Sequence, residues 1–400
     1  MLHPLAERTH RSAVIVYINS IMNATPASSS NNHLQTIDER EQKLLASYAT
    51  FSSQSKGRKY AEPAHPYRGP FQRDRDRIIH SSAFRRLNGK MQVFTGEMGD
   101  YHRTRLTHTH EVASIARTIG RALRLNEDLI EALALFHDIG HPPFGHAGED
   151  ALNLCLEAEG GFSHNQYALT IAEELEIRDG PHSGLNLSRE VLEGQATRVL
   201  KDKQTVPPLL EVQVVEAADS ITYDAHDTDD AVKLKLVTLE ELAEVSLIQN
   251  CLERVGARFH QLAPNIRRRA IVHELIDIQV SHVLQAAEAF LQESNWQDPG
   301  ETFRIGPVEQ LAKEKKELEE FLKSRVYHHP HLLETREMAQ QRIQAMFHGY
   351  QKRVDLLPTR FQERAETFGL PRSVGDYLAS MTDRYCNQQF SQFFANRGEG

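Results

Sequence analysis

The sequence predicts an all-α protein in which β-structure is limited to a short hairpin near residues 91–102. Apolar residues recur at helical spacing from residue 107 onwards, and segments that alternate apolar and polar residues, as half-buried strands do, are few. Aromatic residues make up 7% of the chain and there is a single tryptophan, which argues against a β-rich binding module.

Length and composition narrow the class of protein. A chain of 400 residues can bury a substantial core. The net charge of −9 argues against a dedicated nucleic-acid binder and leaves weak single-strand binding open. The three cysteines are far apart in the sequence and form neither a disulfide framework nor a zinc knuckle, so we expect a cytoplasmic protein. No segment approaches the roughly 20 apolar residues that a membrane span needs, so no membrane partner is expected.

The N-terminal part is read in three pieces. Residues 1–40 contain a run of small polar residues and are predicted to be a disordered extension. Residues 41–70 begin with a short helical pattern and become rich in proline and glycine, which is typical of an arm laid over a neighbouring surface. Residues 71–87 are dense in arginine, and Arg85 and Arg86, beside the apolar face, are the candidates for holding phosphate.

The central helices follow from apolar periodicity. One stripe begins at Val112, and Asn126 has the character of an N-cap for the next helix, whose apolar residues run to Phe136. Pro207 precedes another long run, residues 209–232, and amphipathic helices follow from about residue 237. We expect a catalytic core over 41–236, including the N-terminal arm, and a C-terminal helical region over 237–400 that packs on it.

The residues that follow the helix ending near Phe136 have side chains that can bind metal or transfer protons. His137 and Asp138 are followed by His141 and His146, where the apolar run meets Gly140 and two prolines. A helix that only had to pack would not end in this way. The segment is therefore interpreted as half of a metal site.

Two further segments complete that site. Arg105 and His108 are three positions apart and share a helix face. Farther along, helical spacing places Asp219 on one polar stripe with Tyr223, His226 and Asp227, and such a stripe on a mostly apolar helix needs partners, because buried charges are costly unless they are paired or bound to metal. The predicted ligands are His108, His137, Asp138 and Asp219. This nitrogen and oxygen set suits Mg²⁺, Mn²⁺, Fe²⁺ or Zn²⁺ and does not choose between them.

Acid–base groups lie just beyond the metal half-site. His146 and Glu149 are three positions apart, and a histidine held by a carboxylate is the pairing that a general acid needs. His164 is a third imidazole that the fold could bring to the same place, and His141 is a candidate for binding phosphate. The histidine tract at residues 328–331 is interpreted as exposed surface.

The order of these motifs resembles that of the HD-domain metal phosphohydrolases. The flanking sequence resembles that of the deoxyguanosine triphosphate triphosphohydrolase-like family. The similarity runs from about Tyr48 to the C-terminus and includes the motifs at residues 71–87, 103–109, 137–149, 184–187, 218–227 and 381–385. The chain departs from the family's pattern at two places. His110 stands where the family commonly has an apolar residue, and the sequence after Asn165 lacks an arginine that the family often has there.

The resemblance implies a role for each matched residue. It implies that the four predicted ligands bind a divalent metal, and that His146, Glu149, His141 and His164 act at the scissile phosphate. It also implies that Arg105, Tyr223, Gln92, Arg86 and Asp227 contact the substrate. It further suggests a homo-oligomer and a regulatory nucleotide.

The predicted function is metal-dependent hydrolysis of a deoxynucleoside triphosphate, dGTP or another dNTP, to deoxynucleoside and inorganic tripolyphosphate. Two alternatives stay open at this point. One is another HD phosphohydrolase, such as a nucleotidase or a phosphodiesterase, and the other is a non-catalytic nucleotide sensor.

Overall fold

A computed structural model of the chain describes residues 35–92, 103–177, 182–200, 207–293 and 303–395. Within these ranges the chain forms helices, and β-structure is restricted to two isolated bridges, Arg58 with Ser188 and Met91 with Thr104. The all-α prediction is confirmed. Most of the hairpin predicted near residues 91–102 falls outside the described residues.

The first helices form the N-terminal arm and its attachment. They are α2 (Ile37–Leu44), η1 (Ser52–Gln54), α3 (Pro70–His80), α4 (Ser82–Arg86) and η2 (Leu87–Gly89). The boundary expected at residue 40 falls inside α2, because the Thr36 side chain accepts from the backbone N–H of Glu39 and starts the helix there. Residues 1–34, which make up most of the predicted disordered extension, lie outside the described residues.

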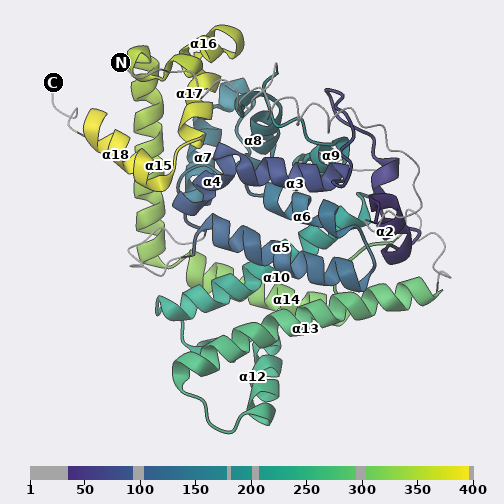
Figure 1. Cartoon of the computed structure of the whole chain (residues 1–400). Coiled ribbons are helices and arrows are strands. Elements are labelled where there is room, and N and C mark those ends of the chain that lie inside the picture. Colours follow the sequence, from purple (N-terminus) through teal and green to yellow (C-terminus); the bar gives the residue numbers. More distant parts are fainter. Residues whose placement is uncertain (1–34, 93–102, 178–181, 201–206, 294–302, 396–400) are drawn as a thin grey trace, which may run out of the picture.

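The central helices carry or directly precede every predicted metal ligand. They are α5 (Arg105–Ala122), α6 (Glu127–Phe136), α7 (Gly145–Cys155), η4 (Glu157–Glu159), α8 (His164–Thr170), η5 (Ile171–Leu175), α9 (Arg189–Val199) and α10 (Leu210–Lys233). Helices α3, α6, α5 and α10 lie one below the other in Figure 1, and α6 has the inner position between α3 and α5. Helix α6 is therefore buried on nearly all sides, including Leu129, Ile130 and Phe136.

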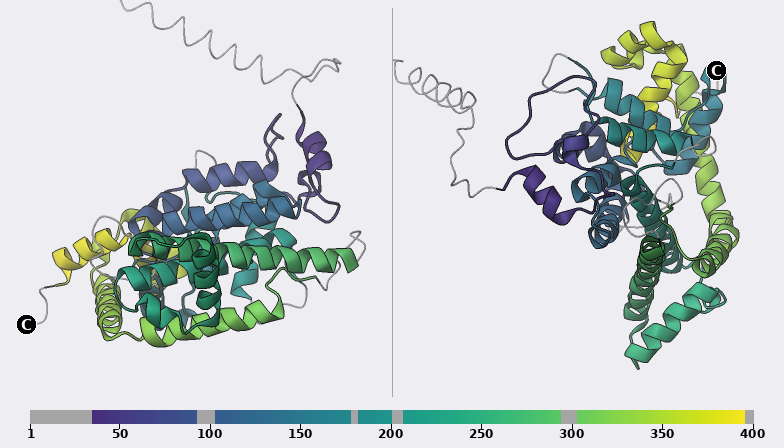
Figure 2. Two further views of the ribbon diagram at one scale, coloured as in Figure 1. Left: turned by 90° about the horizontal axis from the view of Figure 1, so that it is seen from below. Right: turned by 90° about the vertical axis from the view of Figure 1, so that its right-hand side faces the viewer.

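A second group of helices packs on the far side of α10. It consists of α11 (Leu239–Leu242), α12 (Ser246–Arg258), α13 (Pro264–Glu293) and α14 (Glu309–Leu322), followed by the π-helical turn η8 (Lys323–Tyr327). These helices and the end of α10 enclose their own apolar core, which includes Leu247, Ile271, Leu275 and Leu318. Figures 1 and 2 show α12 projecting at the edge of the molecule, whereas α13 packs along α10 and its Val283, Ala287 and Leu291 belong to the first core.

The last helices return to the first core. They are α15 (Pro330–Lys352), η9 (Val354–Leu356), α16 (Thr359–Phe368), α17 (Leu370–Ala379) and α18 (Asp383–Phe393). Helix α15 packs along α7, and Ile343, Phe347 and Tyr377 belong to the same apolar core as α5 and α6. The C-terminal helices thus contribute to both cores, and the division of the chain at residue 236 stays a prediction.

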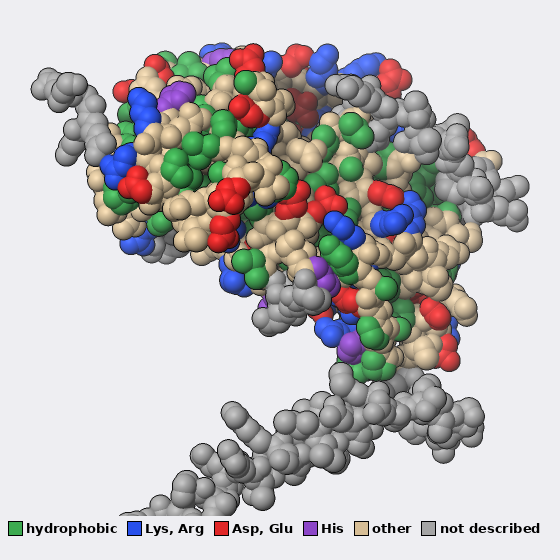
Figure 3. Space-filling view, turned by 90° about the horizontal axis from the view of Figure 1, so that it is seen from above, with side chains coloured by type: hydrophobic (Ala, Val, Ile, Leu, Met, Phe, Trp, Pro, Cys, Tyr) green, Lys and Arg blue, Asp and Glu red, His purple; other side chains and the backbone are tan. Residues whose placement is uncertain are grey.

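The outer surface mixes charges of both signs. Figure 3 shows acidic and basic side chains interspersed on one face without a large field of either sign. Among the described helices, none is both long and apolar enough to cross a membrane.

Candidate active site

The predicted half-site lies at the turn that follows α6. Residues 137–140 form this turn, and His137 caps the helix with its N–H bonded to the Leu133 carbonyl. Gly140 is required here for space, because a Cβ at this position would lie 2.0 Å from the carbonyl oxygen of His164. The same close approach brings the start of α8, and with it His164, against the turn.

The imidazole of His137 is oriented by the backbone. Its Nδ1 donates to the carbonyl of Ala134 at 2.6 Å, which fixes the proton on Nδ1 and leaves a lone pair on Nε2. That Nε2 lies 3.5 Å from Asp138 Oδ1 and 3.6 Å from Asp219 Oδ1. It is buried without a hydrogen-bond partner among the described residues. Burial lowers the pKa of His137, which favours the neutral ring that a metal ligand must be.

The two partners of His137 come from other helices. Thr104 caps α5 and places His108 in its first turn, and Asp219 lies in the first half of α10. His108 Nε2 is 3.1 Å from Asp219 Oδ1. Donor atoms of His108, His137 and Asp138 all lie within 4.8 Å of one another. The structure therefore brings together the four predicted ligands from two helices, α5 and α10, and from the turn after α6.

Two arginines surround the carboxylates of this cluster. Arg105 Nη1 lies 2.8 Å from Asp138 Oδ2, and Arg198 Nη1, from the end of α9, lies 3.2 Å from Asp219 Oδ2. Burial alone raises the pKa of Asp138, but His141, Arg105 and His137 hold it well below its usual value. The pKa of Asp219 is likewise lowered, against the effect of burial, by His137, His108 and Arg198. Both carboxylates are thus held ionised.

This donor set fits a divalent cation. Imidazole and carboxylate are ligands that Mn²⁺, Fe²⁺ and Zn²⁺ share, whereas Mg²⁺ favours the oxygens. The unpartnered, buried Nε2 of His137 is the observation that supports the fit, because a buried polar atom without a partner is costly. The identity of the metal does not follow from these contacts.

The remaining histidines form a second cluster beside the first. The rings of His141 and His164 stack with centroids 3.7 Å apart. Glu149 bridges His164 Nδ1 at 2.8 Å and His146 Nδ1 at 3.2 Å. His141 Nε2 is 3.1 Å from Asp138 Oδ1, so the two clusters share that carboxylate. Burial raises the pKa of Glu149, but hydrogen bonds from His146 and His164 lower it overall, so Glu149 is an anion that steadies both rings.

A cavity of about 580 Å³ opens beside the two clusters. Three of the predicted residues line it, namely Gln92, His146 and Tyr223. The opposite wall comes from the C-terminal helices, with Glu319, Leu322, Lys323, Tyr327, His328, Leu332 and Arg336. The hydroxyl of Tyr327 donates to that of Tyr223 at 2.7 Å and joins the two walls.

The other predicted substrate contacts are placed differently. Asp227 is fully buried, its carboxylate oxygens have no hydrogen-bond partner among the described residues, and burial with the charges of Asp230 and Asp224 raises its pKa well above the usual value. Arg86 donates to Ser82 Oγ at 3.3 Å and is absent from the described lining of the cavity.

Some contacts at the site were not anticipated from the sequence. Buried Lys90 donates its Nζ to the carbonyls of His141 and Ala379, and burial lowers its pKa to about 7. Asp383, at the start of α18, accepts from the N–H of Phe144 at 2.9 Å. Phe144 has a left-handed backbone (φ 63°), a strained conformation for a non-glycine residue that this contact helps to hold. The C-terminal helices therefore support the loop between His141 and His146.

The residues that sequence reasoning missed carry little local signal. Arg198 is an ordinary arginine near a helix end, and Lys90 stands just before the hairpin expected near residues 91–102. The tract at 328–331 was interpreted as exposed surface; His328 is exposed and also lines the cavity. Only the position of His328 after α14 in the folded chain shows that it lines the cavity.

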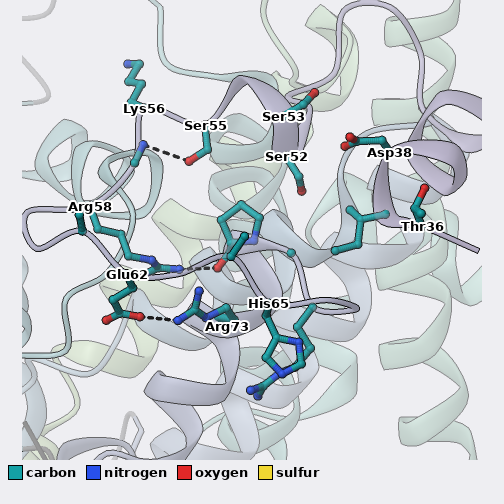
Figure 4. Close-up of a pocket in the computed structure, with 17 residues that line it drawn as sticks. Thr36, Asp38, Ser52, Ser53, Ser55, Lys56, Arg58, Glu62, His65 and Arg73 are labelled. Carbon is teal, nitrogen blue, oxygen red and sulfur yellow. Dashed lines mark hydrogen bonds and ion pairs between the residues drawn. The ribbon is translucent and has the colours of Figure 1, made fainter. Parts of the chain in front are cut away.

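A hollow of similar size, about 590 Å³, lies between the N-terminal arm and α3 (Figure 4). Its three described arginines are already paired: Arg58 with Asp74, Arg68 with Asp76, and Arg73 with Glu62. The last of these pairs is drawn in Figure 4. It contains no cluster of possible metal ligands among the described residues. The chemistry is therefore concentrated in the cavity between α7, α10 and the C-terminal helices.

Two domain models match the chain. The HD domain model matches residues 105–224, and a phosphohydrolase-associated domain model matches residues 306–392. The first match contains all four predicted ligands, and the second covers the outer wall of the cavity from Lys323 to Arg336.

Several curated relatives cover most of the chain. A deoxyguanosinetriphosphate triphosphohydrolase-like protein of Geobacter metallireducens is 38% identical over 370 residues, which is 89% of this chain and 96% of that protein. One of Brucella ovis is 41% identical over 382 residues, covering 87% and 95%. A crystal structure of a hypothetical protein from Aquifex aeolicus matches 72% of this chain and 79% of its own chain, with 17% sequence identity and a TM-score of 0.30. The chain belongs to the deoxyguanosinetriphosphate triphosphohydrolase-like family of HD-domain proteins.

Proposed function

We propose that the protein hydrolyses a deoxynucleoside triphosphate to deoxynucleoside and inorganic tripolyphosphate. One observation supports this most strongly. The cluster of proposed metal ligands contacts the cluster of His141, His146, His164 and Glu149 at the edge of a cavity, because Asp138 Oδ1 lies 3.1 Å from His141 Nε2. A cavity of about 580 Å³ falls within the range of pockets that hold small molecules.

His108, His137, Asp138 and Asp219 would hold the metal. When bound there, a divalent cation lowers the pKa of water and polarises a phosphoryl oxygen. In the reaction proposed, water attacks the α-phosphorus, the bond from that phosphorus to the 5′-oxygen breaks, and tripolyphosphate leaves from the nucleoside.

His146 is the proposed general acid. Its Nδ1 faces Glu149 at 3.2 Å, which leaves Nε2 to deliver a proton to the departing 5′-oxygen. Its side chain is 61% exposed on the cavity side, so a substrate can reach it. His164 shares Glu149 and stacks on His141, and we assign these two rings to the phosphate that reacts.

Arg105 is proposed to offset the negative charge of the triphosphate beside Asp138. Tyr223 and Gln92, on the inner wall, are the proposed contacts to the sugar, and the buried Asp227 is proposed to accept from a sugar hydroxyl. Arg86, which does not line the cavity, is proposed to contact phosphate as the substrate enters the site.

The test is product analysis with the purified full-length protein. Each dNTP is supplied singly and in mixtures with Mg²⁺ or Mn²⁺, and deoxynucleoside, tripolyphosphate, pyrophosphate and phosphate are quantified. Equal amounts of deoxynucleoside and tripolyphosphate are expected, with no product from His137→Ala. Release of pyrophosphate or phosphate instead, or undiminished turnover by His137→Ala, would contradict the proposal. The mixtures also test the proposed regulatory nucleotide, because activation would appear only there.

A further inference from the structure

A chain of three side chains leads from the metal cluster to the protein surface. His108 Nδ1 is 3.2 Å from His226 Nδ1, and His226 Nε2 is 2.5 Å from Glu111 Oε2. His108 and His226 are each 1% exposed, whereas the side chain of Glu111 is 47% exposed. Glu111 is one turn after His108 on α5, and His226 comes from α10.

The hydrogen-bond directions along this chain depend on where the protons lie. A contact between two imidazole nitrogens needs one donor and one acceptor. If His226 Nδ1 were the donor in the neutral ring, its Nε2 would present a lone pair to the Glu111 carboxylate, and two acceptors would face each other at 2.5 Å. The opposite arrangement satisfies every contact. His226 Nε2 donates to Glu111, and His226 Nδ1 accepts from His108.

That arrangement determines the state of His108. Its proton lies on Nδ1, so Nε2 carries the lone pair and points toward Asp219, 3.1 Å away, and the rest of the cluster. A metal-binding histidine typically donates its other ring N–H to a fixed acceptor, which sets the tautomer and ring orientation. For His137, the fixed acceptor is the backbone carbonyl of Ala134.

We infer that His226 and Glu111 are positioning residues for the metal: Glu111 fixes the tautomer of His226, and His226 fixes that of His108. This inference rests on the proposed ligand role of His108 and extends beyond it, because neither His226 nor Glu111 is one of the proposed ligands. Glu111 thus controls a buried metal site from a position that solvent reaches.

The experiment measures binding of Mn²⁺ alone to metal-depleted full-length protein, by the loss of the free-ion electron paramagnetic resonance signal. Glu111→Ala and Glu111→Gln should weaken Mn²⁺ binding by about 10- to 100-fold. Glu288→Gln makes the same charge change on exposed α13 and should leave binding unchanged. Because Glu111 is half-exposed, its variants are expected to keep their circular dichroism and melting temperature.

A matched pair at His226 separates hydrogen bonding from packing. His226→Asn keeps an oxygen that can accept from His108 Nδ1, whereas His226→Leu, of similar size, does not. Binding should be partly retained by the asparagine variant and weakened by the leucine variant. If the leucine variant fails to fold, the two Glu111 variants still decide the question.

The outcomes separate this inference from the proposed function. Wild-type Mn²⁺ affinity in His108→Ala would overturn the ligand assignment itself. Loss of binding in His108→Ala, together with affinities within about twofold of wild type for the folded Glu111 and His226 variants, would overturn the positioning role alone, since about 10-fold is the smallest loss expected.

Discussion

The cluster of proposed metal ligands and the outer wall of the cavity are built on different physical principles. The cluster, on α5, α10 and the turn after α6, lies behind the inner wall and is largely buried, and its carboxylates Asp138 and Asp219 are each paired with an arginine. The outer wall, on α14, η8 and α15, is largely solvent-accessible and meets the inner wall through a few contacts, such as that of Tyr327 with Tyr223. We expect changes to the ligand cluster to affect stability and chemistry together, and changes to the outer wall to affect mainly substrate binding.

The largest effect is expected at Asp138. Asp138→Ala removes the charge partner of Arg105, whose side chain is 2% exposed, and breaking a buried ion pair from one side costs about 3–5 kcal/mol. The free energy of unfolding of metal-depleted protein, measured by urea denaturation, should fall by that amount, and turnover should be abolished. The double variant Asp138→Leu, Arg105→Met should regain most of the stability and none of the activity. A loss below about 1 kcal/mol in the single variant would show that Arg105 is not dependent on Asp138.

His146 should separate chemistry from stability. Since its side chain is 61% exposed, His146→Ala should leave the melting temperature unchanged. General-acid catalysis contributes about 10²- to 10⁴-fold, so kcat should fall by that factor while Mn²⁺ affinity stays at the wild-type value. The measurement is steady-state kinetics on the preferred dNTP. Retention of kcat within a factor of about three would remove His146 from the mechanism.

The contact between Asp224 and Lys315 holds α14 to α10 and predicts a pH dependence. Burial raises the pKa of Asp224 from 3.8 to about 6 in the folded protein, although Lys315 opposes the shift. The native state therefore binds this proton more tightly than the unfolded chain does, and the contribution of Asp224 to the free energy of unfolding declines as pH rises from 3.8 to about 6. Comparison of wild type with Asp224→Asn by urea denaturation at pH 4.5 and 6.5 isolates this contribution. An identical pH dependence in the two proteins would contradict the raised pKa.

The smallest effect is expected at the join between the walls. Tyr327→Phe removes one hydrogen bond to Tyr223, which is worth about 0.5–1.5 kcal/mol. The corresponding rise in KM is about two- to tenfold, with kcat nearly unchanged, since the change lies away from the reacting atoms. Leu332→Ala, on the same wall, controls for loss of packing alone. A fall in kcat without a change in KM would place Tyr327 in the chemistry instead.

The sequence was most informative about the ligand cluster. The all-α fold followed from apolar periodicity, and His108, His137, Asp138 and Asp219 were grouped because such residues are costly in apolar helices without partners. The structure places these four together, and their role as ligands remains a proposal. The sequence analysis considered Arg105 only as a substrate contact, because spacing along one helix does not show that its guanidinium reaches Asp138 in the turn after α6.

The outer wall could not be predicted in the same way. Lys323, Tyr327 and Arg336 belong to amphipathic helices whose pattern indicates only which face is buried. Their position over the cavity depends on how α14 and α15 pack against α10 and α7, which is a property of the tertiary structure. The contacts of Lys90 with Ala379 and of Asp383 with Phe144 join residues more than 200 positions apart and carry no local signal.

The most direct test of the proposed reaction is hydrolysis in water enriched in ¹⁸O. Attack on the α-phosphorus with departure of the 5′-oxygen predicts one ¹⁸O atom in tripolyphosphate and none in the deoxynucleoside, measured by mass spectrometry of both products. Label in the deoxynucleoside, or label in released phosphate or pyrophosphate, would contradict it.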